Sequence, residues 1–397
     1  MADGLILVIN CGSSSIKFAM LDCTSELTVF SGLIEKLGTN EVLLHCDEPY
    51  RHELQLGAID HQLALQALVP LIPREFILKL QGIGHRVVHG GEQFSDAVII
   101  TEEVLAQIEH CSTLAPLHNP ANLLGITAAN QAFPALTNVA VFDTAFHQKM
   151  PDYAYLYPLP YKYYQQYGVR RYGFHGTSHH FVSQKAALLL NKDYDDSCWL
   201  TAHLGNGCSA AAIKNGISID TTMGMTPLEG LMMGTRCGDI DPSLSAYLMK
   251  KLNCSIDELT AIYNKESGLL GVSQLSMDMR ELHKAAASGN HHAKLAIDVF
   301  CYRLSKALGG LAIALGRVDG LIFTGGIGEN DHIVREKVLQ QLTLLGYQLE
   351  SRQNQNHGKE NKGIITQPNS PPALVIKTDE QLMIARQTLE QINRGNL

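Results

Sequence analysis

Two arginines stand in glycine-rich surroundings, where a bound anion could come close to the backbone. Arg86 lies in GHRVVHGG, residues 84–91, and Arg236 lies in MGTRCGDIDP, residues 233–242. A guanidinium presents a planar fork of N–H donors that matches phosphate and carboxylate geometry, which a lysine ammonium does not. The two arginines therefore indicate an anion clamp, although ordinary surface ion pairs explain them equally well when they are taken alone.

Three loops of small residues follow short apolar runs that are typical of strands. They read NCGSSSIKF, LGNGCS and TGGIGEN and span residues 10–18, 204–209 and 324–330. Backbone N–H groups in such loops can approach phosphate oxygens, as can the side chains of Ser13, Ser15, Lys17 and Asn206. The sequence has no GxxxxGK[ST] motif, which disfavours a P-loop fold. Each loop alone is a weak signal, but three in one chain indicate nucleotide binding.

Alternating strand and helix patterns must position these loops. In the first half we expect strands at residues 5–10, 16–21, 27–34 and 138–142. Thr101 and Asn119 read as helix N-caps, the second followed by a proline at the first helical position. The domain crossover is expected in the tyrosine- and proline-rich residues 147–172.

The second half repeats this order. A strand at residues 198–203 leads into LGNG, and a helix starts at Asp241-Pro242. Ser255 and Glu258 form a capping box for the next helix. A long helix at about 291–315 precedes a strand at 320–324, and its Gly309 and Gly310 either weaken it or mark close packing. We expect a surface loop at 351–372, a strand at 373–377 and a helix at 379–392. The repeated order predicts a duplicated α/β fold around a cleft.

Composition narrows the class of protein. A length of 397 residues favours two domains. A net charge of −8 without a long Lys/Arg block gives no support for nucleic-acid binding. No apolar run approaches the roughly 20 residues that span a bilayer, and the first apolar run reads as a strand and not as a signal peptide. Nine scattered cysteines without a CxxC pair indicate free thiols in a reducing cytoplasm. The pairs His179-His180 and His291-His292 read as helix-face histidines.

The chain resembles the acetate kinase family from about residue 7 to 385. The resemblance rests on ordered motifs with the family's spacing: INCGSSSIKF, GHRVVHGGE, APLHNPAN, VFDTAFHQ, RRYGFHGTSHH, HLGNG, TPLEGLMMGTRCGDIDP, FTGGIGEN and TDEQL. It implies an actin-like, sugar-kinase and heat-shock-ATPase type of fold, built from two ribonuclease H-like domains. Residues 1–147 with about 381–397 would form the acyl- and phosphate-side domain. Residues of about 148–380 would form the nucleotide-binding and dimerisation domain.

The resemblance also implies roles for single residues. Arg86 and Arg236 would hold the transferring phosphoryl group and the acyl carboxylate, with Asp143 orienting them. His175 would bond the transferring group and, with Arg236, stabilise the transition state. Asn10 and Glu380 match positions near Mg²⁺, with Mn²⁺ as a substitute. The apolar acyl pocket would consist of Val88, Leu117, Phe174 and Pro227.

ATP-binding positions follow in the same way. The phosphate side would consist of Ser13, Ser15, Lys17, His118, His203, Leu204, Gly205, Asn206 and Gly207. The adenine and nucleoside side would consist of Asp278, Met279, Arg280, Gly325, Gly326, Ile327, Gly328 and Asn330. The chain departs from the family pattern at Lys377, where proline is usual, and in Thr378–Gln381, which reads TDEQ where TNEE is usual. Cys208 replaces a smaller residue, which predicts sensitivity of its loop to thiol reagents.

The implied reaction is the reversible transfer of a phosphoryl group from ATP to acetate, which gives ADP and acetyl phosphate. A carboxylate needs no base, so positioning and charge neutralisation suffice for direct in-line transfer without a phosphoenzyme. The resemblance further implies a homodimer that forms through the second domain. Two alternatives stay open: a propionate or butyrate kinase, and an ATPase of the same superfamily without a carboxylate acceptor.

Overall fold

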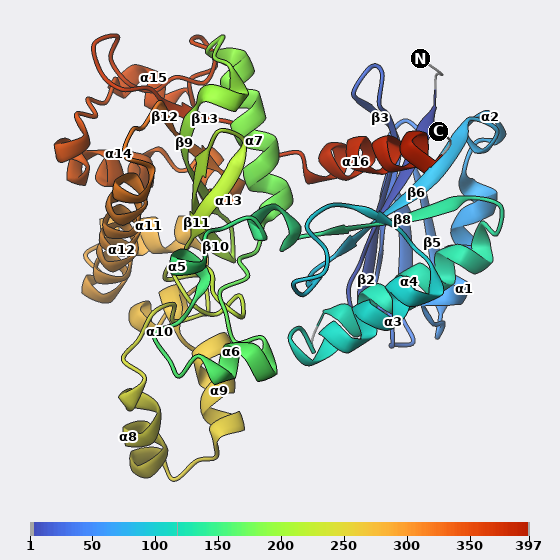
Figure 1. Ribbon diagram of the computed structural model, residues 1–397, viewed down its shortest axis with the longest axis horizontal. Helices are drawn as coiled ribbons and strands as arrows, with labels where there is room; N and C mark the ends of the chain where they lie inside the picture. Colours follow the sequence, from blue (N-terminus) through green and yellow to red (C-terminus); the bar gives the residue numbers. More distant parts are fainter. Residues whose placement is uncertain (1–3, 117, 396–397) are drawn as a thin grey trace. The chain divides into compact units, whose positions relative to one another are not determined.

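The computed structural model describes residues 4–116 and 118–395 and divides into two compact units. The first unit comprises Met1–Gln148 and Asp379–Leu397, and the second comprises Lys149–Thr378 (Figure 1). The first unit therefore combines the beginning of the chain with its last helix. Among the described residues, no helix is both long and apolar enough to cross a bilayer.

The first unit is built on an eight-stranded sheet in the order β5-β4-β3-β2-β1-β6-β8-β7. Strands β1 to β3 form an antiparallel meander, and β1, β6 and β8 run parallel. The bounds are β1 Leu5–Cys11, β2 Ser15–Asp22, β3 Leu27–Glu35, β4 Val42–Cys46, β5 His52–Gly57, β6 Leu80–Val87, β7 Val98–Ile99 and β8 Thr137–Phe142.

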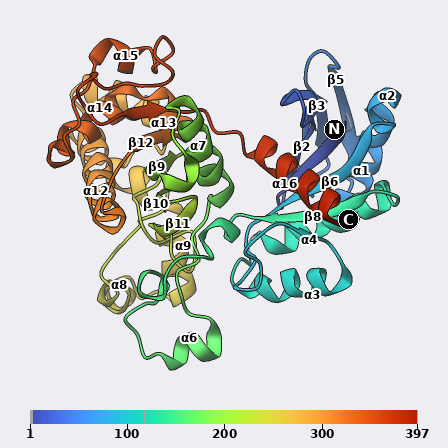
Figure 2. The same ribbon diagram turned by 45° about the horizontal axis from the view of Figure 1, so that its top comes forward.

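Helices cover both faces of this sheet. They are α1 His61–Leu68, α2 Arg74–Ile77, α3 Glu102–His110, α4 Asn119–Ala132 and α16 Glu380–Gly395. Buried side chains of α1 and α4 share a core with Leu7, Ile9 and Ile83. Helix α16 lies on the opposite face, where Gly82 and Gly84 leave room for it (Figure 2). A Cβ at Gly84 would lie 2.3 Å from Thr388 Oγ1, so this close approach requires glycine.

The second unit repeats the topology with a five-stranded sheet, β11-β10-β9-β12-β13. Its strands are β9 Cys198–Leu204, β10 Cys208–Lys214, β11 Ile217–Thr221, β12 Gly320–Thr324 and β13 Ala373–Val375. Strands β9 to β11 form an antiparallel meander, and β9, β12 and β13 run parallel. This order matches β3-β2-β1-β6-β8 of the first unit strand for strand. The predicted duplication is therefore confirmed.

Longer connections distinguish the second unit. Its helices are α5 Asp152–Tyr155, α6 Lys162–Tyr167, α7 Gly176–Leu189, α8 Ser243–Leu252, α9 Ile256–Lys265, α10 Gly268–Ser273, α11 Met279–Ala287, α12 His291–Leu315, α13 Gly325–Asn330, α14 His332–Gln341 and α15 Ser351–Gln355. Short 3₁₀ helices occur in both units at Val69–Leu71, Cys111–Thr113, Ala145–His147, Tyr194–Asp196 and Thr343–Leu345. Helix α12 packs against the sheet and against α10, α11 and α14.

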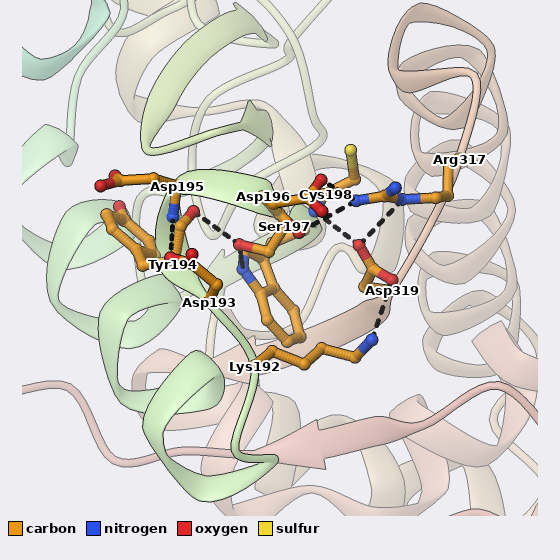
Figure 3. A network of polar contacts seen from close by, with 10 residues as sticks. Lys192, Asp193, Tyr194, Asp195, Asp196, Ser197, Cys198, Arg317 and Asp319 are labelled. Atoms are coloured by element: carbon orange, nitrogen blue, oxygen red, sulfur yellow. Dashed lines mark hydrogen bonds and ion pairs between the residues drawn. The ribbon is translucent and has the colours of Figure 1, made fainter.

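A polar network fixes the amino ends of β9 and β12 (Figure 3). Asp319 precedes β12, and its carboxylate accepts hydrogen bonds from Cys198 N at 2.8 Å, Lys192 Nζ at 3.1 Å and Arg317 Nε at 3.2 Å. Arg317 also donates to the carbonyl oxygen of Asp196 at 3.0 Å. The network joins the amino ends of two neighbouring parallel strands, which leaves their carboxyl ends for the glycine-rich loops.

Three sequence predictions need correction. His118, and not Asn119, is the N-cap residue of α4. The buried Asn119 side chain instead accepts a hydrogen bond from His89 N and donates to His89 O, because the chain after β6 lacks a strand partner there. Gly309 and Gly310 do not mark close packing, since a Cβ at either would meet nothing within 4 Å, and α12 continues through both.

The prediction of a surface loop at residues 351–372 is also wrong. It contains α15 and places Asn354 and Ile365 in the interior, with exposed fractions of 1% and 0%. The polar, glycine-rich composition hid this because Asn354 is buried through hydrogen bonds and not through an apolar side chain. The capping predictions for Thr101 and for Ser255 with Glu258 are confirmed.

Candidate functional site

The carboxyl ends of β1, β6 and β8 bring together Asn10, Arg86 and Asp143. Arg86 donates from Nε to Asp143 Oδ1 at 3.0 Å and from its terminal nitrogen to Oδ2 at 2.6 Å. Asp143 is 2% exposed, and its charge raises the pKa of Arg86 further above its usual value. Arg86 also reaches Asn10 Oδ1 at 3.5 Å. This bidentate pair holds a permanently charged guanidinium in one orientation.

Glu380 is the first residue of α16, and its carboxyl group interacts electrostatically with Arg86 and Asp143. Burial raises the pKa of its carboxyl group, Arg86 lowers it, and the charge of Asp143 raises it again, with a net rise. Asp379 accepts a hydrogen bond from Leu382 N at 2.9 Å, so this departure from the family pattern caps the start of the helix. Two carboxylates, Asp143 and Glu380, thus act on one another beside the Arg86 guanidinium, and a bound cation would stabilise their charged forms.

The donor set fits a hard divalent cation. Asn10 and Glu380 offer amide and carboxylate oxygens, the ligands that Mg²⁺ prefers. Among the described residues, no group of three or more His, Cys, Asp or Glu side chains is arranged to hold a metal. A Mg²⁺ ion bound with a nucleotide needs only one or two protein carboxylates, because phosphates and water complete its shell.

The remaining predicted residues of this unit lie around the same strand ends. Ser13 and Lys17 are exposed in and after the turn between β1 and β2, where Gly12 N donates to Ser15 O at 2.7 Å. His118 is half-buried before α4. Val88 is buried, with 6% of its surface exposed. Leu117 lies outside the described residues.

Sequence reasoning missed Asn122, which supports this site. Its side chain accepts a hydrogen bond from Val88 N at 3.1 Å and donates to Cys11 O at 2.8 Å. It therefore ties the end of β6 to the end of β1. Thr144, which follows β8, accepts a hydrogen bond from Gly90 N at 3.0 Å and so connects the segments after β8 and β6. The motif APLHNPAN contains Asn122, but sequence spacing alone does not show where its amide points.

In the second unit, histidines gather at the carboxyl end of β9. His175 lies stacked on His203, with ring centroids 4.3 Å apart. His175 Nδ1 lies 2.9 Å from Ser209 Oγ, and His203 Nδ1 lies 2.8 Å from Ser178 Oγ. His179 was expected on a helix face, and it is fully buried there and hydrogen-bonded. The structure thus brings the predicted His175 and His203 together.

Arg236 lies beside these histidines across Gly207. A Cβ at Gly207 would lie 3.4 Å from a guanidinium nitrogen of Arg236 and 3.5 Å from His175 Cε1, which are ordinary van der Waals distances, so both side chains border this position. Arg236 donates to the carbonyl oxygen of Pro227 at 3.1 Å. Burial lowers the pKa of Arg236, although a guanidinium remains charged at neutral pH. Phe174, 2% exposed, directly precedes His175.

A cavity of about 700 Å³ lies within the second unit next to this cluster. It brings together most of the predicted nucleotide-side residues: Gly205, Asn206, Asp278, Met279, Arg280, Gly326, Ile327 and Asn330. A Cβ at Gly326 would meet no atom within 4 Å, which leaves open space above the backbone. Leu204, Gly325 and Gly328 do not line the cavity. Gly325 has φ +76°, and a Cβ there would lie 2.9 Å from the Leu204 backbone, so the close packing of these two segments requires glycine.

Sequence reasoning missed the far wall of this cavity, which consists of Met277, His283, Asp331, His332 and Ile333. His283 Nε2 lies 2.7 Å from Asp331 Oδ2, which links α11 to the start of α14. Asp331 also caps α14 through Ile333 N and Val334 N. The cap was readable from the sequence, but the contact with α11 depends on tertiary structure.

Arg335 supports the cavity wall through hydrogen bonds to Asn354 and Gly328. Its side chain is fully buried and donates to Asn354 Oδ1, Asn354 O and Gly328 O, each at 2.8 Å. Burial lowers the pKa of Arg335 to about 10. It therefore fixes α13, which carries Ile327 and Asn330, against α15.

Glu329, another residue without a predicted role, joins the ends of β12 and β13. Its Oε1 accepts hydrogen bonds from Gly325 N at 3.0 Å and Thr378 N at 3.1 Å. The hydroxyl of Thr378 then lies 2.8 Å from Ser178 Oγ, the partner of His203.

The predicted sensitivity of the Cys208 loop to thiol reagents needs correction. Cys208 is fully buried, and burial raises the pKa of its thiol to about 12, which leaves little reactive thiolate.

The sequence and the fold are both similar to those of known kinases. The profile of the acetokinase family matches residues 5–386. An acetate kinase of Ectopseudomonas mendocina (strain ymp) is 53% identical over 97% of this chain and 98% of its own length. The crystal structure of Porphyromonas gingivalis acetate kinase has a TM-score of 0.92 at 43% identity, covering 98% of this chain and all of its own. A propionate kinase from Francisella tularensis gives 0.91 at 43% identity, covering 97% and 98%. The predicted actin-like α/β fold is confirmed by these matches.

Proposed function

The chain belongs to the acetokinase family, and we propose that it is an acetate kinase that transfers the γ-phosphoryl group of ATP to acetate, reversibly. The observation that supports this most is the full-length match to acetate kinases at about half identity. A divalent metal accompanies the nucleotide in such kinases, and we propose Mg²⁺, with Mn²⁺ able to replace it.

The chemistry suits the groups at the strand ends of the first unit. Acetate is an anion at neutral pH and needs no general base. Its obstacle is the negative charge of the phosphoryl group that it must approach. Arg86, held by Asp143, provides fixed positive charge, and the buried Val88 would provide apolar surface for the acetate methyl group. The family resemblance assigns the same role to Leu117. Asn10 and Glu380 would hold Mg²⁺, which supplies charge neutralisation when bound.

In the second unit, the family resemblance assigns Arg236 and His175 to the transferring group, Phe174 and Pro227 to the acyl group, and residues 203–207 to the phosphate chain. In the first unit, it assigns Ser13, Ser15, Lys17 and His118 to the phosphates. The nucleoside would occupy the cavity between α11 and α13, which has room for a drug-sized ligand. Transfer is then a matter of positioning and charge, and proceeds directly in line.

Product analysis tests this proposal. Purified protein with ATP, Mg²⁺ and acetate should form acetyl phosphate, trapped as its hydroxamate, in a one-to-one ratio with ADP. Omitting acetate should abolish ADP release. ADP release at the same rate without acetate would instead identify an ATPase and overturn the proposal.

Propionate is the second candidate substrate, because a propionate kinase structure matches this fold as well as an acetate kinase does. Val88 is the residue that should decide between them, since its buried side chain limits the length of the acyl group. We infer that acetate is preferred and that propionate reacts slowly, because one methylene changes binding by only about 1–3 kcal/mol. Butyrate should react more slowly still. Comparing kcat/KM for the three acids checks this order.

The quaternary structure and compartment are part of the same proposal. A homodimer through the second unit is inferred from the family, and sedimentation analysis would check it. The nine cysteines are free thiols, and six of them are buried. Free thiols of this number favour a reducing cytoplasm, which cell fractionation would check.

A further inference from the structure

A chain of hydrogen-bonding side chains runs from His175 into the second sheet. Ser209 Oγ lies 2.9 Å from His175 Nδ1 and 2.7 Å from His179 Nε2. His179 Nδ1 lies 2.7 Å from Thr201 Oγ1, which is 3.4 Å from the carbonyl oxygen of Ala211. Ser209, His179 and Thr201 are completely buried. We call Thr201, His179 and Ser209 the histidine relay.

The hydrogens available to the relay favour one direction. Each hydroxyl and each neutral imidazole supplies one hydrogen. If His175 Nδ1 donates to Ser209, then Ser209 donates to His179 Nε2, and His179 Nδ1 donates to Thr201. The Thr201 hydroxyl is then free to donate to Ala211 O, which makes four hydrogen bonds.

The reverse direction makes only three of these bonds. Thr201 would donate to His179 Nδ1, and its oxygen would face the carbonyl oxygen of Ala211 with no hydrogen between them. In a third arrangement both histidines donate to Ser209, and the Ser209 hydrogen is left without a relay partner. Buried polar groups without partners are costly, so the first direction should dominate.

We propose that the relay fixes His175 as the Nδ1–H tautomer, so that its Nε2 carries a proton only when the ring is an imidazolium. Nε2 is the nitrogen that faces Gly207, 3.6 Å from where a Cβ would lie, and Arg236 borders the same position. This inference rests on the proposed function, because it says in which form His175 meets the transferring group. A neutral ring would present a lone pair to phosphoryl oxygens, whereas an imidazolium donates a charge-assisted hydrogen bond.

The backbone supports a strict orientation for this ring. His175 has φ +57°, a left-handed conformation that non-glycine residues rarely adopt. Such a conformation persists where the surroundings over-determine it. Charged or titratable groups around the ring include Arg236 across Gly207, His203 stacked on it and His179 behind Ser209.

Nitrogen NMR of the ¹⁵N-histidine-labelled protein tests the tautomer directly. In the neutral state His175 should show a protonated-type shift at Nδ1 and an unprotonated-type shift at Nε2. A His175→Gln sample assigns the signals by their loss. The opposite pattern in the wild-type protein would overturn the proposal, whatever the variants do.

The Thr201→Val variant distinguishes hydrogen bonding through the relay from an effect of side-chain packing alone. Valine removes the acceptor of the His179 Nδ1 hydrogen, so His179 should carry its proton on Nε2 instead. Ser209 then donates to His175, and the His175 tautomer should switch to Nε2–H. Thr201→Ser keeps the hydroxyl and should keep the wild-type spectrum. Thr221→Val is a matched control, because Thr221 is a buried threonine that donates to the neighbouring carbonyl of Ala210 outside the relay.

The pH profile gives a second readout. In the wild-type enzyme, kcat should fall as pH rises through the titration of His175, approaching ten-fold per pH unit. In Thr201→Val this fall should flatten, because a neutral His175 then still donates from Nε2. An unchanged His175 tautomer in a folded Thr201→Val protein would overturn the relay. The spectra need no substrate, so absent acetate kinase activity would refute the proposed function without touching this result.

Discussion

Arg86 and Arg236 were predicted for the same purpose, yet their surroundings differ in kind. Arg86 forms a bidentate ion pair with Asp143, a carboxylate that is 2% exposed. Arg236 is held by the carbonyl oxygen of Pro227 and lies among a glycine and histidines. The first arginine has its charge balanced inside its own unit. Within the part of the chain that the structure describes, no ion pair joins the second arginine to a carboxylate, so its charge can attract an incoming anion.

The largest expected effect comes from removing either arginine. Arg86→Ala and Arg236→Ala should each lower kcat on the order of 10³-fold or more, by analogy with arginines that stabilise phosphoryl-transfer transition states. Near-wild-type turnover at saturating substrates in either variant would exclude the proposed clamp.

Stability should separate the two variants. Arg86→Ala strands the buried Asp143 carboxylate and should cost about 2 kcal/mol, below the 3–5 kcal/mol of fully buried pairs because the Arg86 side chain is 25% exposed. Arg236→Ala leaves no carboxylate of the described residues without its ion-pair partner and should unfold near the wild-type temperature. The double variant Arg86→Ala/Asp143→Asn should recover stability but not activity. Equal melting temperatures for the two single variants would remove the distinction.

His175→Ala should have the next largest effect, a loss on the order of 10²-fold in kcat. Residual activity should remain because both arginines stay in place. With a chiral γ-phosphoryl group, the wild-type and variant products should both show inverted configuration, as a single in-line displacement requires. Retention, or a kinetically competent phosphohistidine at position 175, would contradict direct transfer.

Glu380→Gln tests the pair of carboxylates, Asp143 and Glu380, that lies beside Arg86. The folded pKa of Glu380 is raised, so its protonated form favours folding at pH values below the unfolded pKa, and this contribution is lost as pH rises through the folded pKa. Without Mg²⁺ the variant should therefore melt a few degrees higher than wild type at neutral pH. It should be poorly active and gain little stability from Mg²⁺ with ADP. An identical metal response in both proteins would remove Glu380 from the metal site.

The smallest effect concerns the acyl pocket. Val88→Ala opens space for about one methylene and should shift preference toward propionate by roughly 1 kcal/mol. The ratio of kcat/KM for propionate and acetate in both proteins measures this shift. Leu123→Ala is a control, because Leu123 packs in the neighbouring core without a predicted role in the site. An unchanged ratio in Val88→Ala would place Val88 outside the pocket.

Most strands could be predicted from the sequence because apolar alternation and turn residues are local signals. The duplication was visible for the same reason, since both glycine-containing loops follow a leading strand. The supporting contacts could not be read in this way. Asn119, Asn122 and Asn354 look like cap or loop residues, but each is buried by hydrogen bonds to segments distant in sequence.

Two glycines in the candidate site, Gly325 and Gly326, also have roles that could not be predicted from the sequence. Gly325 and Gly326 are adjacent and were assigned one role from the sequence. Gly325 touches the backbone of Leu204, whereas Gly326 faces the open cavity. Which glycine serves packing and which leaves room for a ligand depends on the neighbouring strand, and no local pattern encodes that neighbour.

Helix α16 has a consequence for how the protein is made. The second unit is continuous from Lys149 to Thr378, whereas the first unit needs the segment from Asp379 onward. On the ribosome, the sheet face at Gly82 and Gly84 must therefore wait uncovered until the whole second unit has been synthesised. Glu380 arrives with the covering helix, so a nascent chain cannot acquire the proposed metal site before the whole second unit has been synthesised. Truncated chains should consequently be inactive and, with an apolar sheet face exposed, should depend on chaperones or be degraded.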